Sequence, residues 1–288
     1  MKSMAKMMLF CAGATLGLMS SMGAILAAPT PIKFMALGDS ITYGYDSNPN
    51  EADHSLTGGS FTGGYRLPFQ NDLSAGGYSY QFVGSQTSNS VGMAQPNHEG
   101  YGSYTIDDTI NGGVPDSTGV SALPLSTRLQ TYKPDVITLL IGTNDIGTGR
   151  STQQVSADME TLISDIYTND PGVTLIVGNI TPRADGYNSA VQSFNAFLPA
   201  IVTAENTNPG YKVYLADLYD AVPLTDLYDA VHPDDDGYNR IANQWYATFK
   251  QTPIGAQAVP EASQMVAFSV LLAGLSGLVL LARRRHAK

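Results

Sequence analysis

The chain has 288 residues, with 15 Lys and Arg against 25 Asp and Glu, so its formal net charge is −10. That length suffices for one large domain or two small ones and for a sizeable apolar core. Residues 29–259 alone hold nine basic and 24 acidic residues, a net charge of −15, and this argues against a nucleic-acid binder because such proteins normally present a basic face. The only cysteine is Cys11, so the chain beyond it can form no zinc ribbon, cysteine nucleophile or internal disulfide.

The N-terminal segment, residues 1–28, predicts a secretory signal peptide. Lys2 and Lys6 give it a positive start, an uncharged apolar stretch follows over residues 7–19, and small residues run on to Ala28. The apolar stretch is too short to cross a bilayer core of about 30 Å. We therefore expect the protein to be exported.

Strand and helix patterns alternate through the middle of the chain. Residues 135–141 are apolar nearly throughout, which is typical of a strand buried on both faces, and residues 152–167 have apolar side chains at helical spacing. The expected strands are 32–37, 80–83, 135–141, 174–177 and 212–216, and the expected helices are 66–74, 121–132, 152–167, 189–204 and 237–249. Such alternation predicts βαβ units, and hence an α/β fold with a mostly parallel sheet covered by helices on both faces.

Two stretches, residues 43–64 and 84–124, are rich in Gly, Ser, Asn and Thr and match neither pattern. Long loops of this kind are more often functional or mobile than packed. In open parallel sheets the active site lies beyond the carboxyl ends of the strands. The residues that directly follow the predicted strands are therefore the candidates for chemistry.

Four segments carry these candidates, and three of them follow predicted strands: 38–42 (GDSIT), 97–105 (NHEGYGSYT), 141–145 (IGTND) and 229–233 (DAVHP). Ser40 can act as a nucleophile if His232 supplies the base and Asp229, three residues earlier, holds the imidazole tautomer. Ser40 also begins a predicted helix, whose backbone N–H groups favour negative charge. Asn144 can add a side-chain donor for an oxyanion. Together these residues predict acyl transfer.

Other histidines and carboxylates are alternatives for these roles. His54 and His98 lie in loops as rival bases, and Glu99 adjoins His98. Asp220 and Asp226 are rival carboxylates, because residues 217–222 and residues 226–231 have the same sequence, DLYDAV.

Several conspicuous residues have simpler structural explanations. We expect Asp39 and Asp145 to make structural hydrogen bonds, Arg66 to tie loops together and Trp245 to lie in the core. The acidic run 234–236 lacks the spaced ligands of a calcium loop and is instead typical of a helix start.

The segments G-D-S-I, G-T-N-D and D-x-x-H-P resemble the signature blocks of the SGNH (GDSL-type) hydrolases, over about residues 32–250. The resemblance implies a flavodoxin-like three-layer α/β/α sandwich over residues 29–255. It also implies ester hydrolysis by a Ser-His-Asp triad, with no metal or other cofactor. By motif, Ser40 is the nucleophile, His232 the base and Asp229 its partner, while the Ser40 N–H and the Asn144 side chain are oxyanion donors. No G-x-S-x-G occurs, which disfavours the nucleophile elbow of the α/β-hydrolases.

A third oxyanion donor comes from the second block of the family, which places a glycine two residues before a threonine. In this sequence Ser103 stands at that position and Gly102 precedes it. A backbone donor survives the change from glycine to serine if the dihedral angles permit. Ser103 is therefore the preferred donor and Gly102 the alternative.

The C-terminal segment, residues 256–288, predicts a sorting tail. Residues 259–262 (VPEA) precede 18 uncharged residues, 265–282, and three arginines follow. At 1.5 Å per residue this stretch is about 27 Å long, enough to cross a membrane with the arginines on the cytoplasmic side. The layout resembles the PEP-CTERM tails of Gram-negative bacteria, with Ala262 in place of a proline. It implies an exosortase-type processing enzyme as a partner and a location in the cell envelope or outside the cell. An ordinary membrane anchor is the alternative.

Three further segments, 63–66 (GGYR), 98–100 (HEG) and His232-Pro233 followed by Gly237-Tyr238, resemble the branch of the family that contains carbohydrate acetyl esterases. We therefore expect an exported esterase that removes a small acyl group, such as acetyl, from a small-molecule or polysaccharide ester. A lipase or thioesterase-like acylhydrolase of the same fold is one alternative. A non-catalytic carbohydrate-binding protein of the envelope is another.

Overall fold

The computed structural model describes residues 30–45, 63–90 and 92–257. The expected signal peptide and sorting tail, with its apolar stretch 265–282, lie outside the described residues, apart from residues 256 and 257. Within the described ranges, no helix combines the length and the hydropathy needed to span a bilayer.

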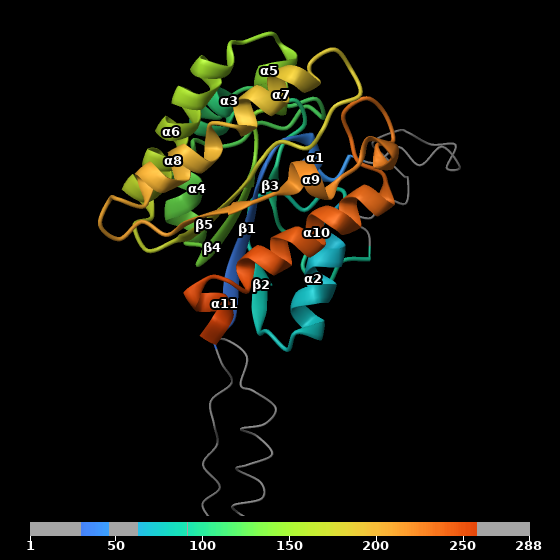
Figure 1. The fold of residues 1–288 in the computed structure, drawn as a ribbon. Helices are drawn as coiled ribbons and strands as arrows, with labels where there is room; N and C mark the ends of the chain where they lie inside the picture. The colour runs from blue at the N-terminus through green and yellow to red at the C-terminus, as the bar shows by residue number, and fades with distance from the viewer. Residues whose placement is uncertain (1–29, 46–62, 91, 258–288) are drawn as a thin grey trace, which may run out of the picture.

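A parallel sheet forms the centre of the molecule (Figure 1). Its strands are β1 (Ile32–Gly38), β2 (Tyr80–Phe82), β3 (Glu99–Gly100), β4 (Val136–Leu140), β5 (Thr174–Gly178) and β6 (Val213–Ala216). They are ordered β2-β1-β4-β5-β6, and β3 pairs with the carboxyl end of β1. All these pairings are parallel. The α/β prediction is therefore confirmed.

Helices cover both faces of the sheet, which gives three layers (Figure 1). The helices are α1 (Ser40–Tyr43), α2 (Arg66–Ala75), α3 (Ile106–Asn111), α4 (Leu125–Tyr132), α5 (Thr143–Gly147), α6 (Thr152–Asn169), α7 (Asn188–Asn195), α8 (Leu198–Glu205), α9 (Leu218–Ala221), α10 (Asp235–Phe249) and α11 (Pro253–Gln257), with a 3-10 turn at Leu224–Asp226. Successive residues of β1 point to opposite faces. Phe34 packs in the core under α2 and α10, and Met35 in the core under α3, α4, α6, α7 and α8.

Prolines account for two differences from the expected helices. Pro124 occupies the N-cap of α4 with ψ 143°, so the expected helix 121–132 begins only at Leu125. The expected helix 189–204 is two helices, α7 and α8, with Pro199 in the first turn of α8. Proline has no N–H, so it cannot continue the hydrogen-bond ladder of a longer helix through this point.

Local capping builds two further helix starts. The loop 84–124, which matched no pattern, contains β3 and α3, and Thr105 and Asp108 form a capping box at the start of α3. Asp234 accepts a hydrogen bond from Gly237 N and caps α10, as expected for the acidic run 234–236. Trp245 of α10 is fully buried.

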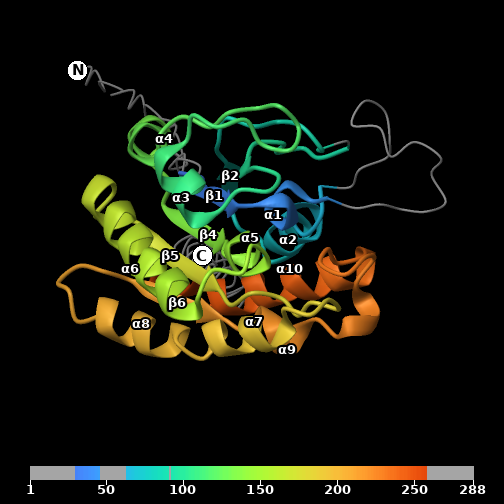
Figure 2. The same cartoon turned by 90° about the horizontal axis from the view of Figure 1, so that it is seen from above.

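The carboxyl ends of β1, β4, β5 and β6 lie along one edge of the sheet, which Figure 2 views from above. The chain passes from β2 on one side of β1 to β4 on the other. Ligand sites in open parallel sheets form at such a switch of direction. Ser40 follows β1 and Asn144 follows β4, so both lie at this place.

Candidate active site

Ser40 is held in a tight turn between β1 and the short helix α1. A Cβ atom on Gly38 would lie 2.1 Å from the carbonyl oxygen of Leu140 in β4, so only glycine allows the turn to pack this closely. Asp39 caps α1 by accepting a hydrogen bond of 2.9 Å from Ile41 N. The N–H of Ser40 is then left at the start of the helix, where no acceptor from the described residues reaches it.

Ser40, His232 and Asp229 are joined by hydrogen bonds. Ser40 Oγ lies 2.8 Å from His232 Nε2, and His232 Nδ1 lies 2.9 Å from Asp229 Oδ2. The other carboxylate oxygen of Asp229 accepts from the backbone N–H groups of Val231 and His232, both at 2.7 Å. The turn thereby fixes the carboxylate and the ring together, with Nε2 directed at the serine.

The charge on Asp229 is stabilised by the same contacts. Burial raises the pKa of this carboxyl, but hydrogen bonds from the ring and backbone of His232 and from Val231 N outweigh it and lower the pKa to about 2. Asp229 is therefore ionised at neutral pH, and it can hold the proton on Nδ1 of His232. Nε2 is then free to accept a proton from Ser40.

Two hydrogen-bond donors, Ser103 N and Asn144 Nδ2, line the pocket beside Ser40. Ser103 has a φ of 66°, in the left-handed region that favours glycine, and among the described residues no acceptor binds its N–H. Gly102 N donates instead to Asp116 Oδ2 at 3.2 Å, so Ser103 is the better donor of the two. The amide nitrogen of Asn144 donates one proton to Tyr104 O at 2.8 Å, which leaves its second proton available.

These groups share one pocket of about 470 Å³, a typical size for a small-molecule site. Tyr45 and Val231 supply its bulky apolar side chains, and several side chains bring hydroxyl or amide groups; the lining residues are Ser40, Tyr45, Ser103, Thr105, Ser117, Asn144, Gly147, Thr148, Arg183, Val231 and His232. The Tyr45 ring lies 4.5 Å from the ring of His232, centroid to centroid.

Arg183 is a functional candidate that the sequence analysis missed. It lines the pocket, and its Nη1 donates to the carbonyl oxygen of Thr143 at 2.9 Å and to the Thr143 hydroxyl at 3.1 Å. Asp185 accepts from its Nε at 3.1 Å. Because Thr143 directly precedes Asn144, Arg183 holds the start of α5. The signal for Arg183 in the sequence is its place after the expected strand 174–177, because residues that follow such strands are the candidates for chemistry.

Asp39 lies beneath the nucleophile and is fully buried. No group in the described part of the chain donates to its Oδ2. Burial raises its pKa to about 7, against the lowering effects of Ile41 N–H, His232 and Arg183, and Asp145 adds to the increase. Its hydrogen bond to Ile41 N agrees with the structural role that we expected.

The rival residues lie elsewhere. His98 is fully buried, its Nδ1 accepts from Gly100 N at 3.0 Å, and its Nε2 bonds to the carbonyl oxygen of Ser88. His54 lies outside the described residues. Asp226 pairs with Arg240 instead of a histidine.

Asp220 and Asp145 are likewise not part of the pocket wall. The N–H of Asp220 bonds to Asp217 at the cap of α9. Asp145 accepts from Ile106 N at 3.1 Å and pairs with Arg150, so the structural role expected for it is confirmed.

Arg66 is buried and joins the nucleophile turn to the loop 84–98. Its guanidinium donates to the carbonyl oxygens of Thr42 and Tyr43, each at 3.0 Å, and to that of Asn89 at 2.6 Å. The expectation that Arg66 ties loops together is confirmed.

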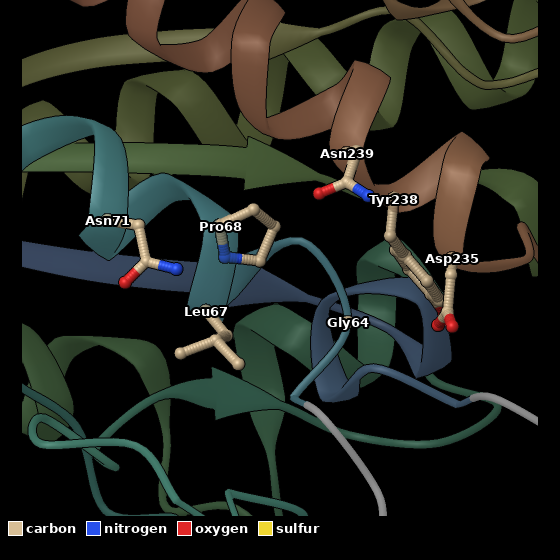
Figure 3. A pocket seen from close by; sticks show the side chains of 7 residues that line it. All are labelled: Gly64, Leu67, Pro68, Asn71, Asp235, Tyr238 and Asn239. Atoms are coloured by element: carbon tan, nitrogen blue, oxygen red, sulfur yellow. The ribbon is translucent and has the colours of Figure 1, made fainter.

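A second cavity, of about 210 Å³, lies between α2 and α10 (Figure 3). It is lined by Gly64, Leu67, Pro68, Asn71, Asp235, Tyr238 and Asn239. This lining contains no serine, cysteine or histidine, and so it offers no nucleophile with a base. Of these two cavities, the larger one holds a serine beside a histidine.

A serine, a histidine and a carboxylate in hydrogen-bonded series, beside N–H donors at the edge of a parallel sheet, define the site type of a serine hydrolase on an α/β/α sandwich. Residues 36–240 match the GDSL-like Lipase/Acylhydrolase family, and the chain belongs to it.

Among solved structures, a Clostridium thermocellum family 3 carbohydrate esterase is 31% identical, with a TM-score of 0.62 over 80% of this chain and 100% of that one. A family 3 carbohydrate esterase from Talaromyces cellulolyticus has the same fold, with 23% identity and a TM-score of 0.61 over 76% of this chain and 97% of that one. A multidomain esterase of Ruminococcus flavefaciens is 27% identical over 247 residues, 80% of this chain but 30% of its own length. A second relative is matched over 58% of its length, so the chain spans less than two thirds of either of these two curated relatives.

Proposed function

We propose that the protein is a serine esterase that removes small acyl groups, in the first place acetyl, from a carbohydrate. The observation that carries this proposal is the hydrogen-bonded series Ser40–His232–Asp229. Ser40 and His232 line one pocket together with Ser103 and Asn144, and the donors are Ser40 N, Ser103 N and Asn144 Nδ2. Membership of an acylhydrolase family supports the ester-cleaving chemistry.

In the proposed reaction, Ser40 Oγ attacks the carbonyl carbon of the ester while His232 Nε2 takes its proton. The carbonyl oxygen becomes an oxyanion, which the N–H groups of Ser40, Ser103 and Asn144 stabilise. The alcohol leaves with the proton from His232. Water, deprotonated by His232, then hydrolyses the acyl-Ser40 ester and regenerates the serine. Asp229 keeps the ring in the required tautomer and stabilises its positive charge throughout.

The wall of the pocket supports a short acyl chain and a polar alcohol. A long acyl chain needs a long apolar groove, whereas Tyr45 and Val231 are the only bulky apolar side chains among the lining residues. The hydroxyls of Ser103, Thr105, Ser117 and Thr148 line the same pocket and can bind a polar alcohol. The negative charge of residues 29–259 disfavours polyanionic substrates. Relatives named carbohydrate esterases agree with a sugar as the alcohol.

Export belongs to the same proposal. It rests on the signal-like residues 1–28 and on the sorting-like residues 256–288. On this proposal the enzyme acts in the envelope of a Gram-negative bacterium or outside it, and an exosortase-type enzyme processes the tail.

The test compares the purified full-length chain with its Ser40→Ala variant. Substrates are p-nitrophenyl acetate, p-nitrophenyl decanoate and acetylated xylan, and a fluorophosphonate probe reports the reactive serine. We expect acetyl-selective turnover and labelling, both lost in Ser40→Ala and both retained in Ser193→Ala, which removes an exposed serine of α7. Preference for the decanoate would favour a lipase. A folded wild-type chain that is inert to every ester and to the probe would leave a carbohydrate-binding protein as the better explanation.

A further inference from the structure

Tyr187 contacts Arg183, a lining residue of the pocket, although it is not a lining residue itself. Its ring centroid lies 5.6 Å from the guanidinium carbon of Arg183, and Arg183 lines the pocket together with Ser40 and His232. The N–H of Ala184 also bonds to the carbonyl oxygen of Ala230 at 2.9 Å. This bond holds the segment that carries Tyr187 beside the turn that carries His232.

The Tyr187 ring is held in place although it is exposed. Asp185 accepts from Tyr187 N at 3.0 Å with one carboxylate oxygen and binds the guanidinium of Arg183 with both. Arg183 in turn contacts the ring, so one ion pair fixes both the backbone and the side chain. The ring nevertheless stays 38% exposed. An aromatic ring fixed in this way loses little conformational entropy when a ligand covers it.

The surroundings of the ring indicate what kind of ligand would cover it. Asp185 already neutralises Arg183, so this edge offers no unpaired cation for an anionic group. The adjoining pocket wall carries the hydroxyl groups of Ser103, Thr105, Ser117 and Thr148 beside apolar surface. A pyranose ring matches both features, because it has a face of C–H groups that can cover an aromatic ring and hydroxyls that can hydrogen-bond.

We propose that Tyr187 is a stacking subsite for a sugar ring of a neutral polysaccharide, next to the sugar whose ester is cleaved at Ser40. This inference rests on the proposed esterase function and names the substrate that this function would take: a polymer instead of an acylated monosaccharide. Tyr187 binds the polymer and takes no part in the chemistry.

The experiment compares wild type, Tyr187→Ala and Tyr187→Phe in the full-length chain. Phe197→Ala is the matched control, because Phe197 is nearly as exposed, at 37%, but lies between α7 and α8, whereas the guanidinium of the lining residue Arg183 lies over the ring of Tyr187. Each variant is assayed on p-nitrophenyl acetate, which has no sugar, and on acetylated xylan and acetylated glucomannan. Binding of xylohexaose and mannohexaose is measured by calorimetry in the Ser40→Ala background.

We expect Tyr187→Ala to raise the KM for a hydrolysed polysaccharide about 5- to 10-fold and to weaken binding of the matching hexaose equally. Hydrolysis of p-nitrophenyl acetate should stay within about twofold of wild type, and Tyr187→Phe and Phe197→Ala should behave as wild type. Unchanged KM for the polysaccharides would overturn the subsite, and so would an equal loss on p-nitrophenyl acetate. Turnover of p-nitrophenyl acetate without turnover of either polysaccharide would also overturn it while the esterase chemistry stands. If no ester at all is hydrolysed, it is the proposed function that fails.

Discussion

The buried carboxyl of Asp39 predicts a specific pH dependence of stability. Its pKa is about 7 in the folded protein, because of burial, against about 3.9 in an unfolded chain. Between these values the unfolded chain has lost the proton and the folded chain still holds it. The folded state therefore binds more protons, and the free energy of unfolding must fall as the pH rises from about 4 to about 7.

The magnitude follows from the two pKa values, which differ by about 3. Each pKa unit corresponds to about 1.4 kcal/mol, so the full loss is about 4 kcal/mol. About half of it, roughly 2 kcal/mol, falls between pH 5.5 and pH 8.5, a range above the ordinary titration of exposed carboxylates. The variant Asp39→Asn cannot ionise and should lack this loss. Its amide still lets Ile41 N donate to an oxygen, and its nitrogen replaces Oδ2, which accepts no hydrogen bond from the described residues.

The assay is urea unfolding at pH 5.5 and pH 8.5, followed by the fluorescence of Trp245, the only tryptophan, which is buried. Relative to Asp39→Asn, the wild type should lose about 2 kcal/mol between the two pH values. The Ser40→Ala variant retains Asp39 and should follow the wild type. If Asp39→Asn loses stability in parallel with the wild type, another group is responsible and the reasoning from burial of Asp39 is refuted.

Three further predictions concern the site. Ser103→Gly relieves the strain of the left-handed backbone and keeps the N–H, so its kcat should stay within about twofold of the wild-type value. The β-branched Ser103→Val should lower both kcat and the urea concentration at the midpoint of unfolding; equal activity of the two variants would show that the backbone conformation at this position is unimportant. Asp229→Asn should leave the fold intact, checked by circular dichroism, and lower kcat about 10⁴-fold because His232 takes the wrong tautomer; a loss below tenfold would exclude Asp229 as its partner. Arg183→Met frees the start of α5 and should lower kcat for p-nitrophenyl acetate at least about tenfold, with little change in KM for that sugar-free ester; in a double-mutant cycle on the same ester it should add nothing to Asn144→Ala, and additive losses would mean that Arg183 acts through another group.

The fold was largely predictable because its signals are local. Residues 135–141 are apolar on both faces, and residues 152–167 repeat apolar side chains at helical spacing, so each segment has one favourable structure by itself. The ends of the helices depend on single residues. The effect of Pro124 could have been read from the sequence, whereas α3 relies on the capping pair Thr105 and Asp108 within a loop without periodicity.

The candidate residues were predictable where a motif directly follows a strand or lies within one short turn. Ser40 and Asn144 follow the strands 32–37 and 135–141 closely, and Asp229 and His232 share one short turn; their catalytic roles remain predictions. Arg183 was missed because the role that the structure gives it depends on a contact with Thr143, which lies 40 residues earlier in the chain. The left-handed backbone of Ser103 was equally hidden, since a serine gives no sign of a positive φ.

The strand order also determines when the site can exist during folding. β1 comes first in the chain, yet it pairs with β4, about 100 residues later, as in the register of Phe34 opposite Val136. The hydrogen bond between Ser40 and His232 joins residues that are 192 positions apart in the chain. Contacts this distant are formed late and slowly, so an early intermediate that contains the serine but has not yet docked the turn after β6 has no base beside it. Recovery of activity after dilution from urea should therefore lag behind the recovery of helical circular dichroism. The rate at which Ser40 regains its reactivity would then report the last step of folding.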